Sequence, residues 1–126
     1  MPGQERAAAT LSPEVEQLAI RLTKDSQSLI RSDAVRLLGE TKLPKYADLY
    51  LTALNDRSYA VVDDASAALG LSRDPRAFDA LVKLTNTPSW KGRIQSAGLS
   101  GLAELGDKKA FDVGYKVATD KSVPFN

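Results

Sequence analysis

Apolar and small residues recur along this chain at the spacing that places them on one face of a helix. In four segments they fall at positions i, i+3, i+4 and i+7. This spacing predicts helices with one buried side, because a strand would alternate apolar and polar positions. The four sets are Val15, Leu18, Ala19 and Leu22; Ala47, Tyr50, Leu51 and Leu54; Phe78, Leu81, Val82 and Thr85; and Phe111, Gly114, Tyr115 and Ala118. We expect these sets to face the core, Tyr50 and Leu51 included.

The helical segments also repeat. Three of them align, at intervals of 31 and 33 residues, when Asp48, Asp79 and Asp112 are superposed. A second kind of helical segment alternates with the first along the chain. Each segment of this second kind ends in a Leu-Gly pair, at residues 38–39, 69–70 and 105–106. A recurrence of this length predicts stacked helical hairpins, none of which can bury its apolar face alone.

Capping residues and glycines set the expected ends of these helices. The capping residues are Ser12, Asp74 and Asp107 for the first helices, and Ser58, Ser89 and Ser122 for the second. We expect the glycines of the Leu-Gly pairs to end the second helices in the left-handed conformation, and small residues four positions before each pair's leucine to permit close helix packing. Those small residues are Ala34, Ala65 and Gly101. The predicted helices cover residues 13–24, 28–39, 44–55, 58–70, 75–86, 89–106 and 108–118, with an extra turn over residues 90–94.

The second helices carry the residues by which the chain resembles a known family. The segment Ile30-Arg31-Ser32-Asp33-Ala34, followed by a Leu-Gly pair, resembles the second helix of a HEAT repeat. The resemblance implies an all-α, right-handed α-α superhelix of about three and a half helical hairpins. It covers residues 12–126, after a flexible tail at residues 1–11, and we expect the last repeat to be cut short, which leaves Phe111 and Tyr115 partly uncovered. In the next copy, valine replaces the arginine, which argues against an Asp/Arg ladder between repeats.

A narrower resemblance covers residues 64–107. This run is similar to the HEAT-like C-terminal region that follows the catalytic domain in bacterial zinc aminopeptidases of the aminopeptidase N type. It implies a non-catalytic scaffold that shapes access to a neighbouring active site, with its second helices on the concave face. Two alternatives stay open: a free-standing protein-interaction adaptor, and a nucleic-acid-binding HEAT protein whose affinity would depend on salt.

Composition argues against an enzyme. The chain has no histidine and no cysteine, which excludes H-E-x-x-H zinc sites, histidine-based triads and thiolate metal sites, so we expect no cofactor. The adjacent carboxylates of Asp63 and Asp64 point about 100° apart on a helix and read as surface charge. Gly98 and Gly101 lie within a predicted helix and indicate close packing rather than a phosphate-binding loop.

Charge and exposed aromatic residues define the candidate partner surface. With 17 Lys plus Arg against 16 Asp plus Glu, the net charge of +1 gives no nucleic-acid signature, and no apolar stretch has the length of a membrane span. We expect a protein or peptide partner, or a neighbouring catalytic domain, and a dimer could form through the uncapped last helix. A lone tryptophan usually packs on its own repeat, with partner anchoring as the alternative; Tyr46 is a further candidate for an exposed contact. The candidate partner-binding residues are Arg31, Arg36, Tyr59, Trp90, Lys91 and Arg93.

Overall fold

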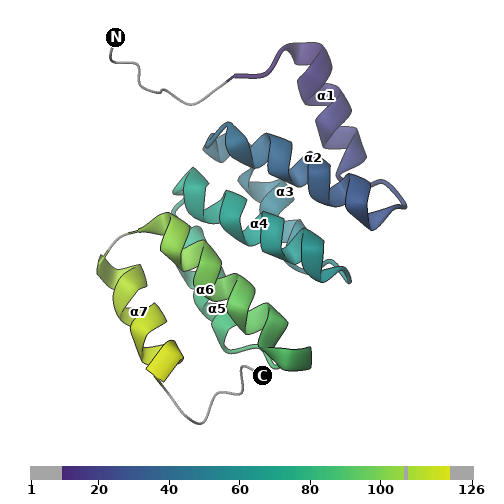
Figure 1. Ribbon diagram of the computed structural model, residues 1–126. Helices are drawn as coiled ribbons and strands as arrows, with labels where there is room; N and C mark the ends of the chain where they lie inside the picture. Colours follow the sequence, from purple (N-terminus) through teal and green to yellow (C-terminus); the bar gives the residue numbers. More distant parts are fainter. Residues whose placement is uncertain (1–9, 107, 120–126) are drawn as a thin grey trace.

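The computed structural model describes residues 10–106 and 108–119, and these form seven α-helices and two 3₁₀ turns without a strand (Figure 1). The α-helices are α1 (Pro13–Leu22), α2 (Ser28–Glu40), α3 (Ala47–Ala53), α4 (Tyr59–Ser72), α5 (Ala77–Thr85), α6 (Arg93–Leu105) and α7 (Lys108–Thr119). The 3₁₀ turns are η1 (Pro44–Tyr46), before α3, and η2 (Trp90–Gly92), before α6. The all-α prediction is confirmed. Residues 1–9 of the expected tail at residues 1–11 lie outside the described residues, as do the expected caps Asp107 and Ser122.

The helices form two layers. Helices α2, α4 and α6 lie side by side, with α4 packed between the other two, and α3 and α5 lie behind them (Figure 1). The first helices α3 and α5 pack against α4 and α6 rather than against each other. Helices on the inner side of a curved stack lie closer together than those on the outer side, so this asymmetry favours the second helices as the inner layer.

The core lies between these layers and follows most of the predicted stripe. Its largest fully buried side chains include Tyr50, Leu38, Leu69, Leu81 and Leu102. The stripe is wrong at Val15 and Leu18, which are exposed because α1 packs mainly against α2. Four other residues of the stripe are half-buried: Leu22, Leu51, Phe78 and Val82.

At the other end of the stack, Phe111 and Tyr115 are 69% and 65% exposed. The expectation that they lack part of their cover is therefore confirmed, and the small Ala110 takes the buried position of α7 instead. The side chains of residues 114, 117 and 118 are not described.

The glycines of the first two Leu-Gly pairs do not end their helices, so that prediction is wrong. Helix α2 continues to Glu40 and α4 to Ser72, and the left-handed residues after them are Lys42 (φ 59°) and Arg73 (φ 57°). A Cβ on Gly39 would lie 2.6 Å from the Cβ of Ala68. A Cβ on Gly70 would collide with the carbonyl oxygen of Gly101. Both glycines therefore serve close helix packing.

Other glycines behave as the sequence predicts. Gly106 ends α6 in the left-handed conformation, at φ 73°. A Cβ on Gly98 would lie 2.9 Å from the carbonyl oxygen of Leu81, and one on Gly101 would lie 2.7 Å from that of Ser66. These short distances confirm that both glycines permit close contact between α6 and its neighbours.

The predicted caps are confirmed in part. The Ser12 side chain accepts a hydrogen bond from the Val15 amide, at 3.2 Å, and begins α1. Asp74 instead accepts from the Arg76 amide in a turn, so α5 begins at Ala77, two residues later than predicted. Ser58 precedes α4 but makes no side-chain capping bond.

The expected extra turn before α6 is a separate 3₁₀ turn. Lys91 (φ 50°) and Gly92 (φ 66°) both take left-handed conformations, so η2 is set apart from α6. The Ser89 hydroxyl accepts a hydrogen bond from the Ile94 amide, at 2.8 Å, and so closes this turn onto the first residues of α6.

Candidate protein-binding surface

Arg31 joins the first repeat to the second. Its side chain is buried, and its Nε and Nη2 atoms donate to the two carboxylate oxygens of Asp56 at 2.9 and 3.0 Å. Its Nη1 atom donates to the carbonyl oxygens of Asp25 and Ser26. A planar guanidinium with four such bonds fixes the loop before α4 against the start of α2. The candidate residue Arg31 is therefore engaged by bonds within the chain.

The carboxylates of Asp63 and Asp64 join three successive second helices. On α4, Asp64 accepts a short hydrogen bond from the Ser32 hydroxyl of α2 and lies 3.5 Å from Nη2 of Arg36. Asp63 accepts from Nη2 of Arg93, on α6, at 3.3 Å. An Asp/Arg ladder between repeats therefore exists, contrary to the sequence analysis, because arginines of the neighbouring helices replace the one missing from α4.

This ladder pairs the charges of two candidate partner-binding residues, Arg36 and Arg93, with carboxylates. Arg36 also pairs with Asp33, at 3.2 Å, and the guanidinium of Arg93 lies 4.9 Å from the ring centre of Tyr59. Tyr59 is half-buried under that contact. Arg36 thus links α2 to α4, and Arg93 links α6 to α4 through Asp63 and Tyr59, with both guanidinium charges paired to carboxylates.

Trp90 and Lys91 form a small exposed feature of their own on η2. Trp90 is 60% exposed, so the expectation that it packs on its own repeat is wrong. The Lys91 ammonium lies 4.7 Å from the centre of the indole ring. Both side chains are exposed to solvent.

Tyr46 is a core residue and not an exposed contact. It is 3% exposed, and its hydroxyl donates to Oε2 of Glu16 at 2.6 Å. Burial, with this hydrogen bond, raises the pKa of Tyr46 to about 12. Lys45 also pairs with Glu16, at 2.8 Å, and the hydrogen bonds from Lys45 and Tyr46 lower the pKa of Glu16. This cluster ties α1 to the second repeat.

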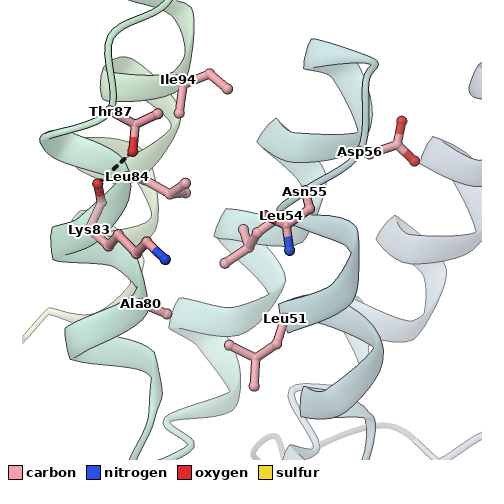
Figure 2. A pocket seen from close by; sticks show the side chains of 9 residues that line it. All are labelled: Leu51, Leu54, Asn55, Asp56, Ala80, Lys83, Leu84, Thr87 and Ile94. Carbon is pink, nitrogen blue, oxygen red and sulfur yellow. Dashed lines mark hydrogen bonds between the residues drawn. The ribbon is translucent and has the colours of Figure 1, made fainter.

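A groove that no residue pattern of the sequence indicates lies between α3 and α5 (Figure 2). Its volume is about 450 Å³, and its walls are formed by Leu51 and neighbouring residues on one side and by α5 on the other. The groove exists because α3 and α5 pack against the second helices and leave a gap between themselves. Its lining residues are Leu51, Leu54, Asn55, Asp56, Ala80, Lys83, Leu84, Thr87 and Ile94.

The groove is lined by apolar side chains and by four polar residues, Asn55, Asp56, Lys83 and Thr87. In Figure 2 the Lys83 side chain extends into the groove from α5, facing Leu54 and Asn55 on the opposite wall, whereas Asp56 points away, toward its bond with Arg31. None of the ion pairs between described residues uses Lys83. The groove therefore offers aliphatic contact, one uncompensated cation and one amide.

Neither a metal site nor a membrane-spanning helix is found among the described residues. They include no group of three or more carboxylate, histidine or cysteine side chains that could hold a metal ion. None of the helices that the structure describes has both the length and the apolar character needed to cross a membrane.

The bond between Arg31 and Asp56 gives a prediction about pH. Burial raises the pKa of Asp56, but the hydrogen bonds from Arg31 and the Ser58 amide outweigh it, so the pKa is lowered in the folded state. A lowered carboxyl pKa stabilises the fold above the ordinary value of about 3.9, and this gain is lost as the pH falls through the lowered value. Asp56→Asn should therefore cost about 1–3 kcal/mol at pH 7, and less below pH 4. Urea unfolding at both pH values measures the difference.

Asp63→Asn is the matched control. Burial raises the pKa of Asp63, and the bond from Arg93 offsets only part of this effect. A raised carboxyl pKa makes the charged form unfavourable in the fold at pH 7, so neutralising Asp63 should cost little or nothing there. If both variants lowered the free energy of unfolding equally at both pH values, the bond between Arg31 and Asp56 would not stabilise the fold as proposed.

Comparisons with known proteins agree with this geometry. A model of the family described as HEAT repeats matches residues 15–100, a range that runs from α1 into α6 and contains the groove and the ladder. A comparison with curated proteins gave no match. The matched range exceeds half of the chain, and its helices pack as a stack of hairpins. The chain therefore belongs to the HEAT repeat family.

Proposed function

We propose that this chain is a non-catalytic helical-repeat scaffold that binds a protein segment in the groove between α3 and α5. The observation that carries the proposal is the uncompensated Lys83 beside the leucines of that groove. Repeat proteins bind partners along surfaces created by stacking, and this groove is such a surface. The groove is lined in part by aliphatic side chains and carries the cation of Lys83, a combination that can receive one aliphatic and one acidic side chain of a peptide.

The chemistry of the groove defines its occupant. Leu51, Leu54 and Ile94 offer contact for one aliphatic side chain, and Lys83 offers a salt bridge to a carboxylate next to it. The Asn55 amide can donate to a backbone carbonyl of the bound segment. The occupant is therefore a short segment with a leucine-like residue close to an aspartate or glutamate.

The resemblance over residues 64–107 supports a more specific form of the proposal. In that form the chain is the C-terminal HEAT-like part of a zinc aminopeptidase, and the occupant of the groove belongs to the catalytic domain of the same polypeptide. Reading the open reading frame on both sides of the chain tests this form. An upstream H-E-x-x-H segment with a later glutamate supports it, whereas a frame that begins at Met1 and closes at Asn126 replaces it with a free-standing adaptor.

Nucleic-acid binding has little support. Three of the four basic residues among the candidate partner-binding residues, Arg31, Arg36 and Arg93, pair with carboxylates of the same chain. Phosphates would have to compete with these internal pairs, and a net charge of +1 provides no long-range attraction.

The groove proposal predicts the effect of reversing one charge. In a library of labelled peptides that contain a leucine and an acidic residue, the best binder should lose affinity by about tenfold or more with Lys83→Glu, because like charges would face each other. Fluorescence polarisation measures the dissociation constant. Lys116→Glu, an exposed change on α7, is the matched control and should leave binding unchanged.

A charge swap completes the test. Replacing the acidic residue of the peptide with lysine should restore part of the binding to the Lys83→Glu variant. If no peptide of the library responds to Lys83, or if Lys116→Glu weakens binding equally, the groove between α3 and α5 is not the binding site.

A further inference from the structure

We infer that the segment bound by this chain is extended and crosses two successive grooves between first helices. This inference rests on the proposed function and identifies the class of peptide: two aliphatic residues, with two residues between them, and an acidic residue outside each. The second groove, of about 230 Å³, also lies against α3, with the end of α1 rather than α5 as its opposite wall. The surface for a partner therefore extends over α1, α3 and α5.

The two grooves are the same feature in successive repeats. The interval of 31 residues that superposes Asp48 on Asp79 also carries four lining residues of the groove between α1 and α3 onto four of the groove between α3 and α5. These residues are Leu49, Thr52, Ala53 and Asp56, which superpose on Ala80, Lys83, Leu84 and Thr87. The apolar stripes of α1 and α3 differ by 32 residues, an offset that superposes Thr23 and Lys24 on Asn55 and Asp56. A partner therefore meets the same arrangement of positions in both grooves.

Ion pairs at equivalent positions join the first helices of each groove near their starts. Nζ of Lys45, just before α3, lies 2.8 Å from Oε2 of Glu16 on α1. Nη1 of Arg76, just before α5, lies 2.7 Å from Oδ1 of Asp48 on α3. The offset of 32 residues relates the two carboxylates, and the interval of 31 residues relates the two cations. Because the same contact joins the helices on both sides of α3, the grooves follow each other regularly along the stack.

Asp56 lies where the two grooves meet. It follows α3 and lines both of them. Nε and Nη2 of Arg31 hold its carboxylate at 2.9 and 3.0 Å, so this ridge is fixed before a partner binds. Packed helices lie about 8–10 Å apart, and the first helices belong to the outer, wider layer of the stack, so the grooves are about 10 Å apart. A bound chain that leaves one groove over the end of α3 therefore enters the other.

The distance between the grooves selects the conformation of the bound chain. Polyproline II has three residues per turn and a rise of about 3.1 Å per residue, so side chains at i and i+3 lie on one side, about 9 Å apart. In a β-strand, side chains on one side lie about 6.6 or about 13 Å apart, at i+2 or i+4. The spacing of polyproline II is the closest to that of the grooves. We therefore expect two aliphatic side chains three positions apart, one in each groove.

Charge defines the residues outside this aliphatic pair. Lys24 belongs to the α1 wall and Lys83 to the α5 wall, so the two cations lie at the outer sides of the surface. Both are exposed, and neither forms an ion pair with a described residue. The carboxylates of Asp48 and Asp56, which also line the grooves, are already paired with arginines. The two unpaired cations therefore favour a carboxylate outside each aliphatic residue of the bound segment.

A labelled peptide with the sequence Glu-Leu-Pro-Pro-Leu-Glu tests the inference, because it has the required pattern in either chain direction. It should bind at least about tenfold tighter than each half peptide, Ser-Ser-Pro-Pro-Leu-Glu and Glu-Leu-Pro-Pro-Ser-Ser, since the second groove is engaged within one complex. Fluorescence polarisation measures the dissociation constants. Lys24→Glu should remove this gain without a change in thermal unfolding. Lys116→Glu, an equal change of charge on α7, is the matched control and should keep the gain.

The same measurements separate this inference from the proposed function. If the full peptide binds no tighter than the half peptides, or if the gain survives Lys24→Glu, the segment does not cross two grooves. A loss of affinity with Lys83→Glu in that case leaves the groove between α3 and α5 as the binding site, whereas no response to Lys83→Glu in any peptide overturns both. Peptides with one or three prolines between the leucines test the spacing and should lose the gain. Equal affinity at all three spacings overturns the extended, three-residue register.

Discussion

Replacing Gly70 with alanine is expected to lower the free energy of unfolding by about 3 kcal/mol or more. The added Cβ would collide with the carbonyl oxygen of Gly101 and lie 3.1 Å from both the Leu105 amide nitrogen and the Glu104 Cβ. Backbone atoms inside a helix cannot give way as a flexible side chain can. Alanine has a higher helix propensity than glycine, but this difference offsets only about 1 kcal/mol of the destabilisation. Because α4 lies between α2 and α6, separating one contact loosens the whole stack.

Gly106→Ala is the matched control for this prediction. A Cβ at Gly106 would meet its nearest heavy atoms at 3.7–3.8 Å, which is ordinary contact. The cost there comes only from the left-handed backbone, at φ 73°, and should be about 1–2 kcal/mol. Urea unfolding followed by circular dichroism compares the two. Equal costs would mean that the crossing of α4 and α6 is looser than the structure indicates.

This pair of glycines also shows how far the sequence predicts the fold. Periodicity and the repeated Leu-Gly pairs identify the hairpins, and most predicted helix ends lie within a few residues of the observed ones. The same pattern assigned one role, the C-cap, to Gly39, Gly70 and Gly106, although only Gly106 has it. A glycine at a helix end and a glycine at a close crossing look alike in one sequence. The difference depends on Ala68 and Gly101, which lie about 30 residues further along the chain.

The binding surface was less predictable than the fold, for a similar reason. The sequence presents Arg31, Arg36 and Arg93 as free cations, but their carboxylate partners lie 25–30 residues away and meet them only when the repeats stack. The groove has no sequence signature, because it is a gap between two first helices. Lys83 is an exposed residue of α5, and its possible role in binding depends on the opposite wall of the groove, which residues near α3 form.

Leu81→Ala is expected to cost about 2–5 kcal/mol, in the upper part of that range. Leu81 is fully buried on α5. Its side chain lies against Gly101, where a Cβ would be 2.5 Å from Cδ2, and its carbonyl oxygen lies close to Gly98. Two glycines carry no side chains that could move into the space left by the leucine. The cavity would therefore persist between α5 and α6, and thermal unfolding should detect the loss.

Leu51→Ala, the same substitution on α3, should cost only about 1–2 kcal/mol, because Leu51 is half-buried and lines the groove that water can enter. Leu51→Ala should instead weaken the binding of the labelled peptide whose affinity depends on Lys83. Leu81→Ala should leave the affinity of the folded protein for that peptide unchanged. The same substitution at the two leucines is therefore expected to lower mainly binding at Leu51 and mainly stability at Leu81. If Leu51→Ala destabilised the chain as much as Leu81→Ala, Leu51 would be fully buried in solution, as its position on the apolar stripe predicts. The groove would then be closed, and the site proposed for peptide binding would have to be abandoned.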